Sequence, residues 1–87
     1  MKIKNGFVLK EVAGSFIVIS VGERVKDFNG IITLNETGAF LWKKLELGAT
    51  EKELIDALLS EYDVEESIAK VDVASFIAKM KEAELLK

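Results

Sequence analysis

The feature that most constrains this chain is a change of sequence period at Asn35, where strand-like residues give way to helix-like ones. Before it, Ile31 to Leu34 form a short apolar run that is typical of a buried strand. After it, apolar residues recur at helical spacing and include Trp42, the only tryptophan of the chain. The Asn35 side chain can accept a hydrogen bond from the first free amides of a helix. The pattern therefore predicts a strand that turns directly into a helix.

The first third of the chain has the composition of β-structure. Apolar, largely β-branched and aromatic residues dominate Phe7 to Ala13 and Phe16 to Val21, and Gly14-Ser15 between them predicts a tight hairpin turn. Asn29-Gly30 is a further turn signal, directly before a third strand at Gly30 to Leu34. We therefore expect three antiparallel strands.

The remainder carries three helical patterns. The first helix should run from Asn35 to about Leu47-Gly48. Thr50-Glu51-Lys52-Glu53 fits the capping-box pattern, so a second helix should start there and end near Tyr62-Asp63. A third should begin around Glu65, with Asp63 as its candidate cap, and reach about Glu84.

Two faces of the third helix carry apolar residues. Placed at helical spacing, one arc forms the expected core stripe, which consists of Ala69, Val73, Phe76, Ile77 and Met80. Small apolar residues on the far side, Val71, Ala74 and Ala78, indicate either a second contact surface or simple helix propensity. Leu85 and Leu86 should fold back onto the core. Strands followed by helices predict an α+β fold for residues 1–87, as a single domain.

Composition excludes most catalytic chemistry. The 87 residues contain no cysteine and no histidine, which removes thiolate nucleophiles, imidazole bases and the usual zinc sites. Neighbouring carboxylates such as Glu65 and Glu66 lie in first helical turns, where they offset the helix dipole. We therefore expect no catalytic residue, no metal and no cofactor. The absence of a long apolar run or signal peptide predicts a cytoplasmic protein.

The predicted third strand is an edge without protection. Ile31-Ile32-Thr33-Leu34 has no charge and no proline to prevent pairing with another chain, so this edge is either covered or used. If it is used, an extended peptide can add to it as a further strand. Gly38-Ala39 at the start of the next helix suggests close approach of another backbone, from the hairpin or from a ligand. Trp42 is interpreted as a core residue.

An ordered set of residues resembles the PqqD-like family, whose members are also called RiPP recognition elements. The resemblance is carried by LNETGAFLWKKLELGATEKELIDALLSEYDV, which starts at Leu34, and by VDVASFIAKMKEAELL, which starts at Val71. It includes the edge strand, a Leu-Trp pair in the first helix, Gly48 before Thr50, and the terminal Leu-Leu. The likeness spans nearly the whole chain.

This resemblance implies a winged helix-turn-helix-like fold that binds the leader of a ribosomally made precursor peptide. The leader would pair with the third strand, beside the third helix, and be presented to a tailoring enzyme such as a radical SAM protein or a leader peptidase. The protein would act as a carrier and not as an enzyme. The predicted peptide-binding residues are Ile31, Ile32, Thr33 and Leu34 of the strand, and Val71, Ala74, Ser75 and Ala78 of the helix.

Two other classes of function remain open. A winged-helix DNA-binding protein would share the topology, but the net charge of −3 and the mixed charges of the third helix disfavour nucleic acid. A homodimer formed edge to edge, or a non-catalytic subunit docked on an enzyme, would occupy the same strand. No membrane partner is expected.

Overall fold

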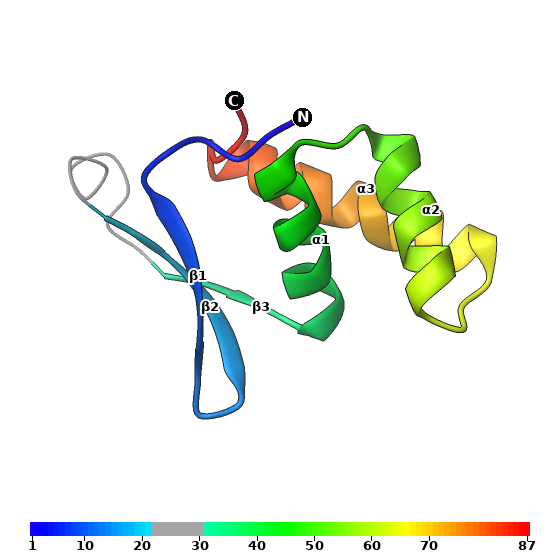
Figure 1. The fold of residues 1–87 in the computed structure, drawn as a ribbon, viewed down its shortest axis with the longest axis horizontal. Helices are drawn as coiled ribbons and strands as arrows, with labels where there is room; N and C mark the ends of the chain where they lie inside the picture. Colours follow the sequence, from blue (N-terminus) through cyan, green and yellow to red (C-terminus); the bar gives the residue numbers. More distant parts are fainter. Residues whose placement is uncertain (22–30) are drawn as a thin grey trace.

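The computed structural model describes residues 1–21 and 31–87. Within them, strands β1 (Phe7–Val12), β2 (Ser15–Ser20) and β3 (Ile32–Leu34) precede helices α1 (Glu36–Leu47), α2 (Glu51–Glu61) and α3 (Glu66–Glu82) (Figure 1). The three strands form one antiparallel sheet, so the predicted α+β class is confirmed. The expected turn at Asn29-Gly30 and the expected strand start at Gly30 lie outside the described residues.

The hairpin of β1 and β2 closes on a two-residue turn. Ala13 and Gly14 both have positive φ, 51° and 80°, as in the type I′ turns whose twist matches that of paired strands. Val12 pairs with Ser15 across this turn. The predicted turn at Gly14-Ser15 is therefore wrong by one residue, because Ser15 already belongs to the strand. Figure 1 shows the tip of this hairpin pointing away from the helices.

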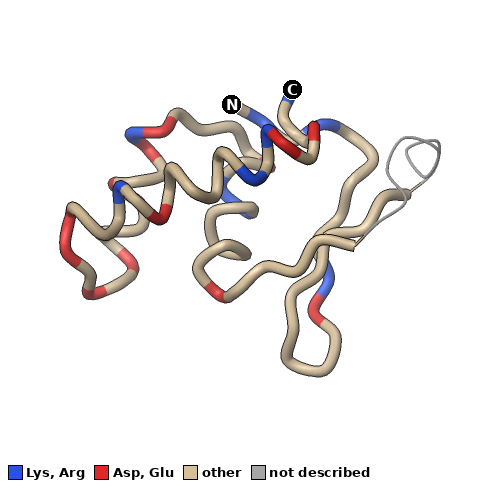
Figure 2. Tube along the Cα trace, turned by 180° about the vertical axis from the view of Figure 1, so that it is seen from behind, with Lys and Arg blue, Asp and Glu red and all other residues tan. Residues whose placement is uncertain are grey.

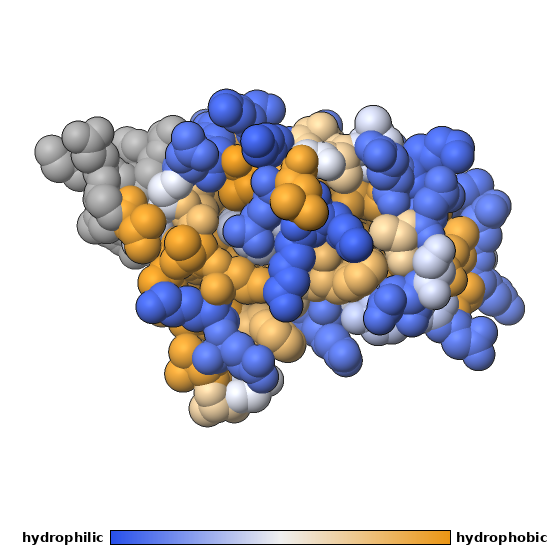
Figure 3. All heavy atoms as spheres, viewed as in Figure 1, coloured by the Kyte–Doolittle hydropathy of each residue, from blue (hydrophilic) through white to orange (hydrophobic). Residues whose placement is uncertain are grey.

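Strand β3 forms one edge of the sheet, which has the order β1-β2-β3. It pairs antiparallel with β2, with Thr33 opposite Ile17 and Leu34 opposite Phe16. Side chains alternate between the two faces of a strand. Accordingly Leu34 is buried and packs in the core, whereas Thr33 is exposed. Figure 3 shows apolar side chains gathered over the strands, at the lower left of the view.

The core lies where the sheet meets the helices. Trp42 is completely buried, which confirms its interpretation as a core residue. All residues of the stripe predicted on α3 are also buried, namely Ala69, Val73, Phe76, Ile77 and Met80. This stripe fixes the rotation of α3 about its own axis, because turning it would expose large apolar side chains to water.

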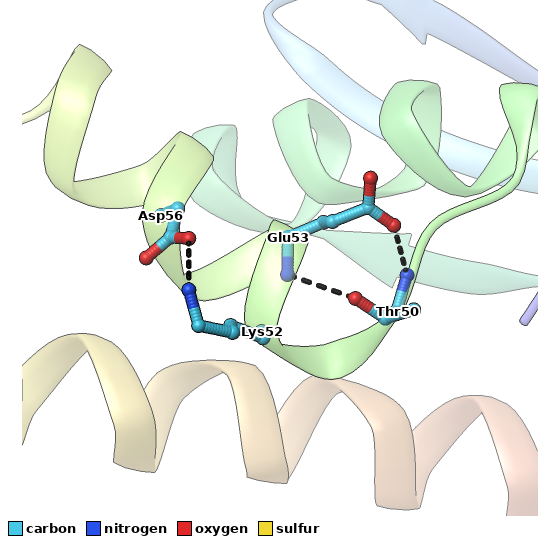
Figure 4. Close-up of polar contacts among 4 residues, drawn as sticks. All are labelled: Thr50, Lys52, Glu53 and Asp56. Atoms are coloured by element: carbon cyan, nitrogen blue, oxygen red, sulfur yellow. Dashed lines mark hydrogen bonds and ion pairs between the residues drawn. The ribbon is translucent and has the colours of Figure 1, made fainter.

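Side chains cap the first two helices as the sequence predicts. The Asn35 Oδ1 atom accepts a hydrogen bond from the Gly38 amide at 2.7 Å, at the start of α1. At the start of α2, the Glu53 amide donates to Thr50 Oγ1 at 3.1 Å and the Thr50 amide donates to Glu53 Oε1 at 2.9 Å (Figure 4). This is the reciprocal capping box.

The predicted cap of the third helix is wrong. Glu65 occupies the N-cap position of α3, with no side-chain cap hydrogen bond, and Asp63 lies two residues before it. Glu65 has an extended backbone, with ψ at 150°, so the helix starts one residue later than expected. The helix also ends earlier, at Glu82, because Ala83 and Glu84 turn the chain back, the latter with a φ of 58°.

The two chain ends lie side by side (Figure 1). Ile3 and Leu86 form an antiparallel bridge, and the Met1 ammonium donates to the Ala49 carbonyl at 2.8 Å. Leu85 is fully buried, so the expected return of this segment to the core is confirmed. Nothing in the sequence indicates the pairing of Leu86 with Ile3, since the partners are separated by almost the whole chain. In the part that the structure describes, no helix has both the length and the apolar character to cross a bilayer.

Replacing Thr50 with alanine should lower the free energy of unfolding by about 1 kcal/mol, because the Glu53 amide loses its acceptor. Urea denaturation followed by circular dichroism measures this change. Thr50→Ser keeps the hydroxyl and should remain within about 0.5 kcal/mol of wild type. An equal loss in both variants would contradict the capping role.

Candidate functional site

A cleft opens between β3, the start of α1 and one face of α3. Its volume is about 420 Å³, within the range of ligand-binding clefts. Three apolar residues with little exposed surface lie at its base, namely Leu34, Leu41 and Phe76. The other residues that line it are Thr33, Asn35, Thr37, Gly38, Asp72, Ser75 and Lys79. The cleft therefore combines an apolar floor with a polar rim.

The junction of β3 and α1 forms one end of this cleft. The Asn35 side chain accepts a hydrogen bond from the Gly38 amide. The Asn35 backbone carbonyl accepts a second one from the Ala39 amide, at 2.9 Å. A Cβ atom at Gly38 would lie 3.1 Å from Asn35 Oδ1 and 3.3 Å from Leu34 Cβ. Glycine thus allows the cap and the buried end of the strand to approach the helix. The approach predicted at Gly38-Ala39 is real, but at Gly38 it involves these two side chains and not another backbone.

The outer edge of β3 faces the cleft at Thr33. The Lys79 Nζ atom, on α3, donates to the Thr33 carbonyl oxygen at 3.0 Å. In an antiparallel strand, the N–H and C=O of one residue leave the strand on the same side, and successive residues alternate. The Thr33 amide is therefore directed to the outer edge with its carbonyl, while the groups of Ile32 and Leu34 are directed to β2.

The face of α3 that lines the cleft differs from the one expected. Asp72, Ser75, Phe76 and Lys79 line it, at the i, i+3, i+4, i+7 spacing of a single helix face. Of the four helix residues predicted to bind peptide, only Ser75 is among them. The other three, Val71, Ala74 and Ala78, are exposed and lie about a third of a turn further round the helix. Their role in binding stays a prediction.

Of the four strand residues predicted to bind peptide, only two line the cleft. Thr33 and Leu34 line the cleft, whereas Ile31 and Ile32 lie beyond its end. Ile31 is 66% exposed, which leaves it accessible to a partner. Sequence reasoning missed Asp72, Phe76 and Lys79. Their common spacing is visible in the sequence, but Phe76 also belongs to the predicted core stripe, and nothing in the sequence distinguishes Asp72 and Lys79 from the other charged residues of the helix.

Few ionisable groups line the cleft. Within residues 1–21 and 31–87 there is no group of three carboxylate, histidine or cysteine residues close enough to hold a metal ion. The charged residues that line the cleft are one acid, Asp72, and one base, Lys79. What the cleft does offer is an open strand edge, hydroxyl groups and an apolar floor, which together suit an extended peptide.

A second group of aromatic residues lies outside the cleft. Phe40 meets Tyr62 edge to face, with 5.5 Å between the ring centroids, and Lys44 Nζ lies 5.2 Å from the Phe40 ring centre. Burial, and then the carboxylates of Glu36 and Glu61, raise the pKa of the Tyr62 hydroxyl. The ring contact joins α1 to the end of α2, whereas the lysine contact lies within α1, so we interpret this group as helix packing.

Comparison with known proteins assigns the chain to a family. The profile of the family described as "Coenzyme PQQ synthesis protein D (PqqD)" matches residues 7–86. The chain belongs to the PqqD family. The resemblance inferred from its residues is therefore confirmed, and the matched range includes every described residue that lines the cleft. No curated protein matches this PqqD family member.

Two solved structures share the fold of this PqqD family member. One is described as "TbiB1 in Complex with the TbiA(beta) Leader Peptide", with 24% identity and a TM-score of 0.77, covering 100% of this chain and 95% of that chain. The other is described as "Lasso peptide synthetase B1 complexed with the leader peptide", with 22% identity and a TM-score of 0.71, covering 93% and 89% respectively. The arrangement of sheet and helices is thus common to all three chains.

Replacing Gly38 with alanine should lower the free energy of unfolding, although alanine is favoured over glycine inside a helix by about 1 kcal/mol. The new Cβ crowds Asn35 Oδ1, which its own hydrogen bond holds in place, and the buried Leu34. We expect a net loss of about 1 kcal/mol in urea denaturation. The same substitution in an Asn35→Ala background should cost less, since one of the crowded atoms is gone. A more stable single variant would contradict the close approach.

Proposed function

We propose that the protein binds the leader segment of a ribosomally made precursor peptide by strand addition to β3. The observation that carries this proposal is that the outer edge of β3, at Thr33, faces a cleft with an apolar floor. Two proteins of the same fold are described as complexes with leader peptides, which supports the same role for this chain. The bound leader is then presented to a separate tailoring enzyme, such as a radical SAM protein or a leader peptidase.

The size of β3 determines how such a complex must be stabilised. The strand has three residues, and only Thr33 directs its amide and carbonyl to the outer edge, so β3 offers a partner two backbone groups. Each hydrogen bond contributes about 0.5 to 1.5 kcal/mol, whereas micromolar binding requires about 8 kcal/mol. Backbone pairing alone is therefore insufficient. Apolar side chains of the leader must enter the cleft and contact its floor, and these contacts set selectivity.

The protein itself is a carrier and not a catalyst in this proposal. Its sequence has no histidine or cysteine, and the cleft brings together no pair of groups suited to general acid and base catalysis. The chemistry on the peptide belongs to the partner enzyme. Holding the leader at a fixed place near that enzyme raises the effective concentration of the segment to be modified.

The charge distribution does not favour nucleic acid as the ligand. Figure 2 shows basic and acidic residues interspersed along α3. A helix that enters the major groove needs cations to offset the repulsion between phosphates and its own carboxylates. The acidic residues of α3 are Glu66, Asp72 and Glu82, and its basic residues are Lys70, Lys79 and Lys81. We therefore assign the exposed face of α3 to a peptide partner.

The binding mode can be tested with synthetic leader segments of short peptides encoded beside the gene. Thr33→Pro removes the one amide that faces the outer edge, and proline is tolerated at such positions of an edge strand. We expect at least about tenfold weaker binding in isothermal titration calorimetry, because an added strand loses a hydrogen bond and is blocked by the ring. Thr33→Val keeps the amide and should bind within about twofold of wild type. Equal affinity in the two variants would exclude strand addition at Thr33.

A second pair of variants locates the helix face that contacts the leader. Ser75 and Ala74 are adjacent and exposed, but only Ser75 lines the cleft. Ser75→Arg should abolish binding by filling the cleft, while Ala74→Arg should weaken it by less than about threefold, as expected of an exposed substitution outside the contact. Amide chemical-shift mapping with the same peptide provides the independent check. Shifts that avoid residues 31–34 and 72–79 would exclude the site.

A further inference from the structure

One acceptor on the outer edge of β3 is already occupied in the free protein. The Lys79 ammonium donates to the Thr33 carbonyl across 46 positions of sequence. An added strand needs the same oxygen, because Thr33 is the residue of β3 whose backbone groups face outward. A carbonyl oxygen can accept two hydrogen bonds, but the Lys79 ammonium lies on the edge that the peptide would cover, so it competes with an incoming amide for the outward side of this oxygen.

The Lys79 ammonium has no carboxylate partner among the residues that the structure describes. The ion pairs found there join Lys52 to Asp56 and Lys70 to Glu66. Asp72 lines the same cleft but precedes Lys79 by two helical turns, about 10 Å along α3. A docked strand would cover the displaced ammonium and remove part of its water. A charge that loses water without gaining a partner disfavours the complex, so the peptide must supply that partner.

We propose that Lys79 is a gate on the edge of β3, which the leader opens with a carboxylate. In the free protein, the ammonium holds the Thr33 carbonyl and protects the edge from unspecific pairing, as lysines at sheet edges do. In the complex, a leader amide replaces it and a leader Asp or Glu side chain pairs with the ammonium. The inference rests on the proposed leader binding and adds its ligand class, an extended segment with an acidic residue beside Lys79.

The free protein provides the first test. Lys79→Met keeps the length and the apolar part of the side chain but removes the donor. The matched control is Lys81→Met, which also removes a positive charge from the last turn of α3 and does not line the cleft. The carbonyl carbon resonance of Thr33 should shift in Lys79→Met and stay at its wild-type position in Lys81→Met. An unchanged resonance in both variants would overturn the gate without any peptide being present.

Binding provides the second test. The probes are a leader segment that binds wild-type protein and a copy in which each Asp and Glu is replaced by Asn or Gln. Wild type and Lys81→Met should prefer the acidic peptide by about fivefold, the size expected of one partly exposed ion pair. Lys79→Met should lose this preference and bind the neutral copy about threefold more tightly than wild type does, because the carbonyl is already free.

The outcomes separate this inference from the proposed function. If Lys79→Met keeps the acidic preference, or if the neutral copy binds it no better than wild type, the gate is excluded while leader binding stands. If no leader segment shifts the amides of residues 31–34 in wild type or in Lys79→Met, the proposed function fails. In that case the Thr33 carbonyl resonance still decides whether Lys79 closes the edge of the strand.

Discussion

The structure depends on how β3 turns into α1. Leu34 ends the strand inside the core, Asn35 caps the helix, and the Gly38 amide closes the cap at 2.7 Å. Because the three residues are in direct contact, the strand and the helix hold a fixed angle with no intervening loop. The same residues form one end of the cleft. The hydrogen bond between Asn35 and Gly38 therefore positions both β3, which forms the binding edge, and α1, which supports it.

Helix α3 supplies the opposite wall, and its rotation is set from the other side. The buried stripe that includes Val73, Ile77 and Met80 packs into the core, which turns Ser75 and Lys79 toward β3. Phe76 belongs to both surfaces, since it is 7% exposed and still lines the cleft. Packing of the core thus determines which polar groups face the edge of the strand. A substitution in the stripe would alter the cleft without touching any residue on its rim.

Whether the sequence could predict an interaction depends on how far apart the two residues lie in the chain. The caps at Asn35 and Thr50 involve residues three positions apart, and the core stripe of α3 follows from helical spacing, so all three were confirmed. The pairing of Ile3 with Leu86 and the bond from Lys79 to Thr33 join distant segments, for which a single sequence has no signal. The cleft-facing side of α3 was mostly missed for this reason, because it lies between the two apolar faces that a helical wheel shows and only tertiary packing reveals it.

The short length of β3 balances two opposing requirements, which are tight binding of a leader and avoidance of unspecific pairing. A longer open edge would bind a leader more tightly through its backbone, but it would also pair with other copies of the chain or with unrelated peptides. At the edge formed by β3, backbone pairing is too weak to select a partner, so discrimination must come from the side chains around it. Lys79 acts at this point, because it makes the few available hydrogen bonds conditional on a partner of suitable charge. Because β3 is short and Lys79 closes its edge, specificity depends on whether a leader can displace the Lys79 ammonium from the Thr33 carbonyl.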